Sequence, residues 1–463
     1  MRRIAAIAAA KAAAALSQRL KMGGGTALPG LVAERIDPHI VPEMARRLGQ
    51  GSVIITGTNG KTTTSRLLRG IVRAAGLRPV ANRAGSNLMR GIAAALAQAA
   101  GLDGGFAGAK RRLGLFEVDE ATVPEAARAL RPRLVLFTNL FRDQLDRYGE
   151  VEHVAAVWRD AVRTLGDSAT VVLNADDPSI AALAQAATGR VLFYGVEDTS
   201  RESEGLEHAA DARWCSSCGS ELVYSAVFYG HLGHWRCPSH CRIARPSPRV
   251  VATRIEMEPE GTSLMIAMPG GEVSARLPLT GLYNAYNALA AVAAAVALGI
   301  ESEAIERGLG SFTAAFGRQE RLTVGGRRVQ VILAKNPAGL NEVLRTITAD
   351  GEEKDVALFL NDGIADGRDV SWIWDVDFDL LAGNVRSLTV SGNRAWDMAL
   401  RLKYAGLDTP SEVEEDTATA LRRALRATPE DGNLYVVPTY TAMLQVRELL
   451  ARWARQPAFW ETS

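Results

Sequence analysis

Short apolar runs alternate with stretches of helical periodicity along most of this chain of 463 residues. In the first half, apolar runs lie at 52–56, 113–118, 134–138 and 170–174, and helical patterns lie at 62–75, 123–130 and 154–165. Apolar runs bounded by turns or charges are typical of buried parallel strands, and their alternation with helices is typical of βαβ units. The pattern predicts the α/β class, with a parallel sheet covered by helices on both faces.

The pattern changes at two places farther along. Residues from about 205 to 245 are rich in Cys, Ser, His, Tyr and Trp and show no helical period, which indicates an inserted segment. After strand patterns at 250–268 and a helical stretch at 284–298, a second α/β series begins near Leu322, with strand-like runs at 329–333, 356–360, 387–390 and 433–438. We expect an N-terminal helical segment (1–50), a central domain (51–320) that holds the insertion, and a C-terminal Rossmann-like α/β domain (321–463).

The first 22 residues are rich in alanine, a strong helix former, and three glycines follow at 23–25. This predicts a short N-terminal helix, whose basic residues are Arg2, Arg3, Lys11, Arg19 and Lys21. Such a helix can lie on an anionic membrane surface, or it can pack against the body of the protein. No stretch of about 20 strongly apolar residues occurs, so we expect no membrane span.

Charge and cysteine content narrow the class of protein. Lys and Arg (53) nearly balance Asp and Glu (52), which argues against a wide nucleic-acid-binding face, so we expect no nucleic-acid partner. Hydrophobic residues make up 47% of the chain, enough for a sizeable core. All four cysteines lie between 215 and 241, which argues against scattered disulfides and favours a metal site in a reducing compartment. We expect a protein of the cytoplasm or of the inner face of the cell membrane.

The cysteines form two pairs inside the inserted segment. Cys215 and Cys218 form a CxxC pair, and Cys237 and Cys241 form a slightly wider CxxxC pair, with His240 as a substitute ligand. Four thiolates suit a closed tetrahedral Zn²⁺ site, so we predict a zinc ribbon that staples a segment with a small core. The ribbon also holds arginines and tryptophans, which can stack on nucleic-acid bases or cover that small core: Arg213, Trp214, Trp235, Arg236 and Arg242.

The strongest motif follows the first predicted strand and opens a helix. It consists of Gly57, Thr58, Asn59, Gly60, Lys61, Thr62 and Thr63. Glycines let the backbone wrap closely around phosphates, and a helix N-terminus points free N–H groups at them. Lys61 offers a positive charge to the β- and γ-phosphates, and Thr62 offers a hydroxyl to Mg²⁺. The motif predicts a site for ATP and Mg²⁺.

This compact T-G-T-N-G-K-T-T form resembles the Mur ligase superfamily, which includes the peptidoglycan stem-peptide ligases and folylpolyglutamate synthase. The resemblance continues in chain order through Glu117, Asp143-Gln144-Leu145-Asp146, the segment 174–178, Asn284, Asn287 and Arg318. It implies that Glu117 binds Mg²⁺, that the two asparagines lie near adenine, and that Arg318 approaches the nucleotide. By their sequence alone, Asn284 and Asn287 also suit a helix cap and a turn. In this superfamily ATP phosphorylates a carboxylate, and an amine attacks the acyl phosphate.

Three departures from the superfamily narrow the substrate. Lys61 lies only about 60 residues from the start of this sequence, so we expect no UDP-binding domain before it and a substrate without a UDP handle. Many relatives carry a carbamylated lysine on the helix at 154–165, but this helix offers only Arg159 and Arg163, which cannot form the carbamate. The segment 332–337, Ile-Leu-Ala-Lys-Asn-Pro, lacks the acidic residue expected to touch the ribose.

The segment 365–375, A-D-G-R-D-V-S-W-I-W-D, follows the predicted strand at 356–360, at the edge of the sheet where sites form. Together with the ribbon and the early phosphate loop, it resembles the MurT family, the Mur-ligase-like subunits of lipid II isoglutaminyl synthase. The resemblance implies ATP-dependent amidation of the D-glutamate α-carboxylate of lipid II to D-isoglutamine. It also implies that the ammonia comes from a GatD-type glutaminase in a heterodimer and that Asp369 orients the histidine of that partner, with Asp366 and Asp375 as alternatives.

Two other functions remain open from the sequence. A self-sufficient amino-acid ligase of the folylpolyglutamate synthase type would use a free amino acid as its amine. A nucleic-acid-binding ATPase would use the zinc ribbon, and its binding would weaken with salt. All cysteines lie in the ribbon, so the chain itself offers no thiol nucleophile for a glutaminase.

Overall fold

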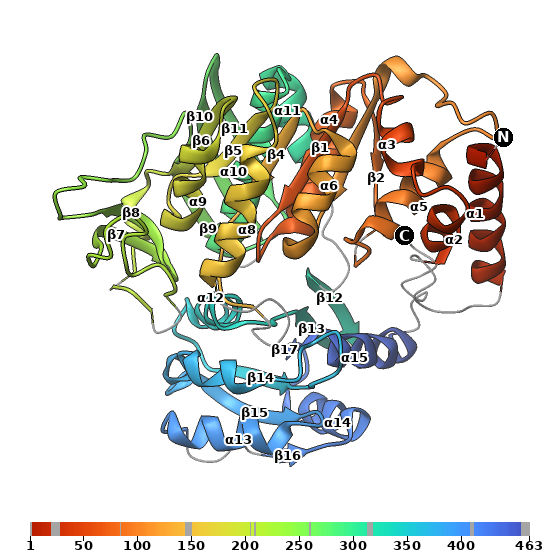
Figure 1. The fold of residues 1–463 in the computed structure, drawn as a ribbon. Coiled ribbons are helices and arrows are strands. Elements are labelled where there is room, and N and C mark those ends of the chain that lie inside the picture. The colour runs from red at the N-terminus through yellow and green to blue at the C-terminus, as the bar shows by residue number, and fades with distance from the viewer. Residues whose placement is uncertain are drawn as a thin grey trace.

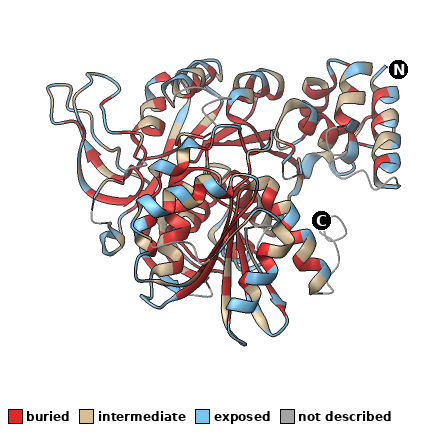
Figure 2. Ribbon diagram, turned by 90° about the horizontal axis from the view of Figure 1, so that it is seen from below, coloured by how far each residue is buried: buried red, intermediate tan, exposed pale blue. Residues whose placement is uncertain are grey.

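The structure is a computed structural model that describes residues 2–19, 28–83, 85–143, 151–203, 205–207, 210–258, 261–312, 318–407 and 412–454. Two large sheets form its frame, a nine-stranded sheet in the upper part of Figure 1 and a six-stranded sheet in the lower part. Buried residues are concentrated in the strands of both sheets and on the helix faces that cover them (Figure 2). The chain therefore builds two packed α/β layers that meet along one edge.

The larger sheet has the strand order β11-β10-β9-β6-β5-β4-β1-β3-β2. Its strands are β1 (Ser52–Thr56), β2 (Arg78–Ala81), β3 (Arg112–Glu117), β4 (Leu134–Phe137), β5 (Thr170–Asn174), β6 (Arg190–Val196), β9 (Val250–Glu258), β10 (Gly261–Met268) and β11 (Gly271–Leu277). The seven strands from β9 to β2 in this order are parallel, as the alternating pattern predicts. Strands β10 and β11 add an antiparallel edge. The sheet is therefore mixed rather than purely parallel.

Helices cover both faces of this sheet because successive strand residues point to opposite sides. Val53 and Ile55 belong to one core cluster, which includes helices α4 (Lys61–Ala74), α10 (Leu282–Ala297) and α11 (Ser302–Gly310). Ile54 belongs to the opposite cluster, which includes α5 (Met89–Ala99), α6 (Val123–Leu130) and α8 (Val151–Arg163). The two faces of β1 thus fix the start of α4 at the carboxyl end of the sheet.

Three N-terminal helices extend the second cluster: α1 (Arg2–Arg19), α2 (Leu28–Ile36) and α3 (Ile40–Ala45). Helix α1 packs against α2 and α5 and buries Ala6, Ile7 and Ala10. Of the two alternatives for this segment, the structure shows packing on the body, while Lys21 and the glycines at 23–25 lie outside the described residues. Among the described residues, no helix has the length and apolar character needed to cross a bilayer.

The inserted segment forms a small antiparallel sheet between β6 and β9. It consists of β7 (Val223–Tyr229) and β8 (Leu232–Arg236), and the short helix α9 (Pro178–Ala181) lies against it. Among the described residues, a separate core cluster beside this sheet holds five buried residues: Ala181, Cys215, Leu222, Trp235 and Cys237. Trp235 covers this core and donates its indole N–H to the Ala175 carbonyl at 3.0 Å, whereas Trp214 is 62% exposed. The segment also packs on the main core, where β7 and β8 bury Phe228, Tyr229 and Leu232.

The second sheet has the strand order β12-β13-β17-β14-β15-β16. Its strands are β12 (Arg318–Val324), β13 (Arg327–Ile332), β14 (Lys354–Phe359), β15 (Val385–Ser391), β16 (Glu412–Glu414) and β17 (Asn433–Pro438). Its helices are α12 (Pro337–Thr348), α13 (Ala395–Tyr404), α14 (Thr417–Ala427) and α15 (Tyr440–Trp453). All strands from β13 to β16 in this order are parallel, and β12 forms an antiparallel hairpin with β13. Helix α12 starts at the edge that faces the larger sheet (Figure 1).

Candidate functional site

The predicted phosphate loop joins β1 to α4 and needs glycine at two positions. Gly57 has φ 138° and Gly60 has φ 86°, a backbone region that glycine adopts without strain. A Cβ atom at Gly57 would lie 1.9 Å from Thr138 Oγ1, and one at Gly60 would lie 1.9 Å from Asn287 Oδ1. The loop is therefore packed tightly against β4 and α10, and α10 brings Asn287 directly to it.

Lys61 begins α4 and folds back on its own loop. Its ammonium donates to the carbonyls of Gly57 and Thr58, the latter at 3.3 Å, and pairs with Glu120 Oε1 at 2.7 Å. Burial raises the pKa of Glu120, and the charge of Lys61 opposes that rise. The Lys61 ammonium thus rests on groups that an anionic phosphate can replace. Glu120 was missed by the sequence reasoning, because the pair forms between residues 59 positions apart.

The two residues predicted to hold Mg²⁺ are brought together. Thr62 Oγ1 lies 2.9 Å from both carboxylate oxygens of Glu117, and both side chains are buried. Asn82 fixes Glu117 from the other side, accepting from its N–H at 2.9 Å and donating to its carbonyl at 2.8 Å. A hydroxyl and a carboxylate at one point are the hard oxygen donors that Mg²⁺ prefers, so the donor set fits this ion.

The other predicted nucleotide residues lie in the first turn of α4, around the start of α10 and on β12. Asn287 donates to Asn284 Oδ1 at 3.2 Å, and Asn284 donates to the Thr280 carbonyl at 2.8 Å. Both asparagines are buried and neither is the N-cap, which is Gly281. Thr63 is buried in the first turn of α4. The backbone of Arg318 opens β12, and its side chain lies outside the described part of the structure.

Residues from the second sheet reach the phosphate loop. Asn336 and Asn59 exchange side-chain hydrogen bonds, at 2.9 Å from Asn336 Nδ2 to Asn59 Oδ1 and at 3.4 Å in the other direction. The neighbouring Lys335 forms an ion pair with Asp143, which lies in the segment after β4. These contacts also escaped the sequence reasoning, and residues 144–146 of the predicted D-Q-L-D segment lie outside the described residues.

Helix α8, which holds no lysine, presents an indole to this site. Trp158 is fully buried and donates from Nε1 to the Glu120 carbonyl at 2.9 Å. Arg163 instead pairs with Asp160 at 2.7 Å, and both side chains are exposed. The helix therefore supports Glu120 through Trp158.

The four cysteines of the insertion meet at one point, as predicted for a metal centre. Four Sγ–Sγ distances are 3.7 Å (Cys215–Cys241), 3.5 Å (Cys218–Cys237), 3.5 Å (Cys218–Cys241) and 3.2 Å (Cys237–Cys241). Four sulfurs around a tetrahedral Zn²⁺ lie about 3.8 Å apart, because each Zn–S bond is about 2.3 Å. The thiols are not joined as disulfides. The donor set and its spacing therefore fit zinc.

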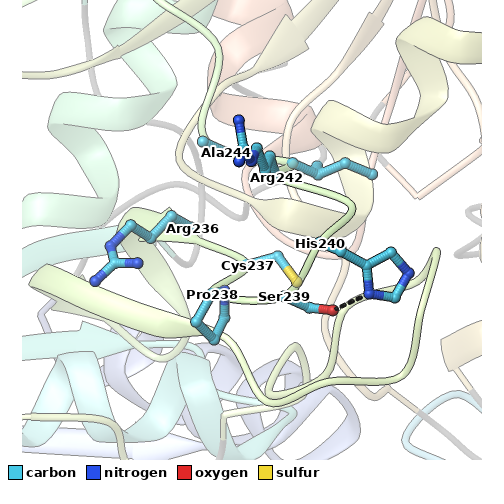
Figure 3. A pocket seen from close by; sticks show the side chains of 8 residues that line it. Arg236, Cys237, Pro238, Ser239, His240, Arg242 and Ala244 are labelled. Carbon is cyan, nitrogen blue, oxygen red and sulfur yellow. Dashed lines mark hydrogen bonds between the residues drawn. The ribbon is translucent and has the colours of Figure 1, made fainter.

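The surroundings of the cysteine cluster bear on which residues bind the metal. Hydrogen bonds with Ser220 lower the pKa of Cys218 to about 5, which favours the thiolate that a metal needs. His240 is exposed and bonds through Nδ1 to Ser239 Oγ at 3.0 Å, so it stands outside the cysteine cluster. Figure 3 shows this histidine at the rim of an open pocket formed by residues 236–240 and 242–244.

The three aspartates of the C-terminal signature have different surroundings. Asp366 is buried, and its two oxygens accept from Thr441 N–H at 2.9 Å, from the Thr441 hydroxyl and from Gly363 N–H at 3.2 Å. Asp375 accepts from Arg142, which lies in the segment after β4, at 2.7 Å. Asp369 is exposed and accepts from Ser371 N–H at 2.8 Å, and the hydrogen bonds with Ser371 lower its pKa. Asp369 is therefore the aspartate of the three that faces solvent as a carboxylate.

Helix α13, which packs against residues 373–376 of the same segment, exposes apolar side chains that were not predicted. Helix α13 exposes Trp396 (65%), Leu400 (50%) and Tyr404 (73%), which lie four residues apart and share one helix face. Trp374 packs edge-to-face against Tyr404, with ring centroids 5.5 Å apart and an interplanar angle of 62°. Arg401 of the same helix donates to the carbonyls of Ile373 and Val376, at 3.2 and 2.6 Å. This helix face is therefore continuous with the segment that follows Asp369.

Two family matches divide the chain in the same way as the two sheets. Residues 55–223 and 224–295 match the family described as Mur ligase middle domain, and residues 333–443 match the family described as MurT ligase C-terminal.

Curated relatives match nearly the whole chain. The MurT subunit of lipid II isoglutaminyl synthase (glutamine-hydrolyzing) from Staphylococcus aureus (strain COL) is 31% identical over 445 residues, 96% of each chain. The subunit of the same name from Streptococcus pneumoniae (strain ATCC BAA-255 / R6) is 32% identical over 93% of each chain.

Solved structures resemble the fold at lower sequence identity. A pseudomurein peptide ligase type C from Methanothermus fervidus has a TM-score of 0.66 at 23% identity and covers 87% of this chain and 78% of its own. Folylpolyglutamate synthase from Mycobacterium tuberculosis, complexed with ADP and AMPPCP, has a TM-score of 0.61 at 17% identity and covers 91% and 96%. At these identities the likeness concerns the fold alone.

Proposed function

This chain belongs to the MurT family of the Mur ligases, and from that membership we propose that it is the synthetase subunit of a lipid II isoglutaminyl synthase. The proposed reaction amidates the α-carboxylate of D-glutamate in the lipid II stem peptide, which gives D-isoglutamine. A carboxylate oxygen takes the γ-phosphoryl group of ATP and ADP leaves. Ammonia then attacks the acyl phosphate, phosphate leaves, and a proton is released. The pairing of Thr62 with Glu117 at the head of the phosphate loop is the observation that carries this proposal.

The residues of the phosphate loop have distinct roles in this proposal. The loop residues from Gly57 to Thr63 surround the phosphates, the backbone N–H groups at the start of α4 bind them, and Lys61 moves from Glu120 to them. Thr62 and Glu117 hold Mg²⁺, which supplies charge neutralisation at the phosphates when bound. Asn284 and Asn287 lie beside the adenine, and Arg318 approaches the nucleotide from β12.

A separate glutaminase of the GatD type supplies the ammonia in this proposal. Asp369 is exposed as a carboxylate. The apolar face of α13, which packs against residues 373–376 of the same segment, suits a protein partner. In the heterodimer, Asp369 orients the catalytic histidine of the glutaminase and stabilises its charged form. Asp366 and Asp375 fit this role less well, because both are engaged within the chain.

The cysteine cluster serves as a structural zinc site in this proposal. Zinc bound by Cys215, Cys218, Cys237 and Cys241 closes the inserted segment, whose own apolar core is small. Metal analysis of the purified chain should give one zinc per molecule. Substitution of Cys218 by serine should lower that content, whereas substitution of the exposed His240 by alanine should leave it unchanged.

The proposed substrate is anchored in the membrane, so the protein works at its inner face. Helix α1 leaves Ile4 (43%) and Leu16 (58%) exposed, together with Arg2 and Arg19, which suits a peripheral contact with anionic lipid.

We also propose the division into an N-terminal segment 1–50, a central domain 51–320 and a C-terminal domain 321–463, with the reaction site where the two sheets meet.

The decisive experiment combines co-purification with an amidation assay. The chain, expressed with the glutaminase of its own genome, should purify as a heterodimer that amidates lipid II with ATP and glutamine. The isolated chain should amidate lipid II with ATP and ammonium ions but not with glutamine. Full amidation by the isolated chain with glutamine would contradict the proposal. ATP turnover stimulated by a folate and a free amino acid would favour the self-sufficient ligase instead.

A further inference from the structure

The contact between the two sheets places a second ammonium group beside the phosphate loop. Lys335 lies between β13 and α12, and it pairs with Asp143, whose side chain is 5% exposed. The Lys335 side chain is 31% exposed, so this ammonium lies at the mouth of the site. Among the described residues, no donor reaches the other oxygen of Asp143, Oδ1, although that oxygen is buried. The pair is therefore a single ammonium contact on a carboxylate with an unused oxygen.

Both partners of this pair are tied to the phosphate loop. On the side of Asp143, Phe141 N–H donates to Thr58 Oγ1 at 3.0 Å, and Thr58 donates back to the Phe141 carbonyl at 3.0 Å. On the side of Lys335, the neighbouring Asn336 forms the amide exchange with Asn59. Thr58 and Asn59 are adjacent residues of the phosphate loop. The ion pair of Lys335 is therefore anchored to the same loop that carries Lys61.

The charges around the loop show why a second cation is useful. Glu120 is buried, and the charges of both Lys61 and Lys335 oppose the rise in its pKa that burial causes. The two lysines therefore act on one point of the site. The proposed reaction brings a carboxylate against a phosphoryl group, two anions whose approach needs positive charge. Helix α8 contains no lysine that could be carbamylated.

We propose that Lys335 is a catalytic residue that the C-terminal sheet contributes to the phosphate site, where its ammonium neutralises the transferring phosphoryl group. This inference rests on the proposed function. During transfer the bond between the γ-phosphorus and its bridging oxygen breaks, and a bond to the substrate carboxylate forms. Lys335 donates hydrogen bonds to the phosphoryl oxygens and transfers no proton. Asp143 holds the ammonium before the nucleotide arrives.

The test compares Lys335→Ala with the alanine substitution of a second lysine from the C-terminal part of the chain. Lys354 is also paired with an aspartate, Asp350, at 2.6 Å, but it lies at the start of β14. With the glutaminase present, Lys335→Ala should lower ammonia-driven amidation about 100-fold or more while ATP and ADP bind with unchanged affinity. It should also weaken binding of ADP with aluminium fluoride, which mimics the transferring group. Lys354→Ala should change none of these quantities by more than about twofold.

The outcomes separate this inference from the proposed function. If the unsubstituted complex amidates lipid II and Lys335→Ala binds ADP–aluminium fluoride normally, this inference is overturned and the proposed function stands. If the unsubstituted complex shows no ATP-dependent amidation, the proposed function fails first. The exchange variant, Lys335→Asp with Asp143→Lys, restores an ion pair between the sheets. Recovery of activity in that variant would show that the pair is only a structural latch, whereas continued inactivity supports the catalytic assignment.

Discussion

The phosphate loop and the segment around Asp369 satisfy their polar groups in different ways. At the loop, Lys61, Glu120, Thr62 and Glu117 are buried and bond to one another. In the segment of Asp369, the carboxylate is exposed, and α13, which packs against residues 373–376 of that segment, exposes apolar side chains to solvent. In the first region the polar side chains find their partners within the chain, and only small molecules remain to be bound. The second region is a surface with exposed apolar area. We infer that one region works within the chain and that the other works only when another protein covers it.

The largest expected effect comes from Asp369→Asn. In the heterodimer, glutamine hydrolysis should fall by about 10⁴-fold, because an amide cannot stabilise the charged histidine of the partner. Amidation driven by added ammonium ions should be retained, since the phosphate loop is untouched. Asp375→Asn is the matched variant, because Asp375 is bonded to Arg142. If Asp375→Asn removes glutamine hydrolysis and Asp369→Asn does not, the roles of these two aspartates are reversed.

Lys61→Ala should produce the opposite pattern, with a somewhat smaller effect. Loss of the loop cation should lower amidation by about 10³-fold with ammonium ions as well as with glutamine. Lys110→Ala removes an exposed lysine that precedes β3 at the other end of the sheet, and it should have no such effect. Rates of amidation and of glutamate release, measured on the same samples, check both claims. Ammonia-driven amidation that survives in Lys61→Ala would refute the assignment of the loop.

The sequence reveals the local parts of both regions and misses the parts that depend on distant contacts. The phosphate loop is readable because strand, glycines, lysine and helix are consecutive, and β1 lies where the apolar run predicts it. Strand β2 was missed because it is a four-residue edge strand that contains Pro79. Glu120 and Lys335 were missed because their partners are 59 and 192 residues away. The apolar face of α13 was missed because the outer side of a helix is not marked by its own periodicity.

A tryptophan exchange tests whether α13 is the surface that the glutaminase covers. Trp396→Ala should weaken the heterodimer by about 10-fold or more in Kd, because a buried tryptophan at an interface commonly contributes about 2 kcal/mol. Trp214→Ala removes a tryptophan of similar exposure, 62% against 65%, from the inserted segment. It should leave the affinity unchanged. If titration shows the reverse order, the partner docks on the inserted segment, and the contrast drawn here between the two regions loses its basis.

The smallest effect concerns the joint between the inserted segment and α12. Glu207 of that segment bonds to Arg345, and Glu342 lies beside both, so burial and the charge of Glu207 raise the pKa of Glu342 to about 8. Because the folded chain keeps a proton that the unfolded chain releases above its ordinary pKa of 4.5, stability should fall as the pH rises from about 4.5 to 8. Glu342→Gln replaces the carboxyl group with an amide, which can still form hydrogen bonds but carries no charge.

This substitution should therefore flatten the pH dependence and stabilise the protein by about 1–2 kcal/mol at pH 8.5, a shift of a few degrees in the melting temperature. Glu352→Gln alters an exposed glutamate just after α12 and should leave the pH dependence as it is. Thermal unfolding at pH 5.5 and pH 8.5 measures both variants. An equal loss of stability with pH in Glu342→Gln and in the unsubstituted chain would mean that Glu342 is ionised in the folded state. In that case Arg345, which contacts both carboxylates, holds two charges rather than one.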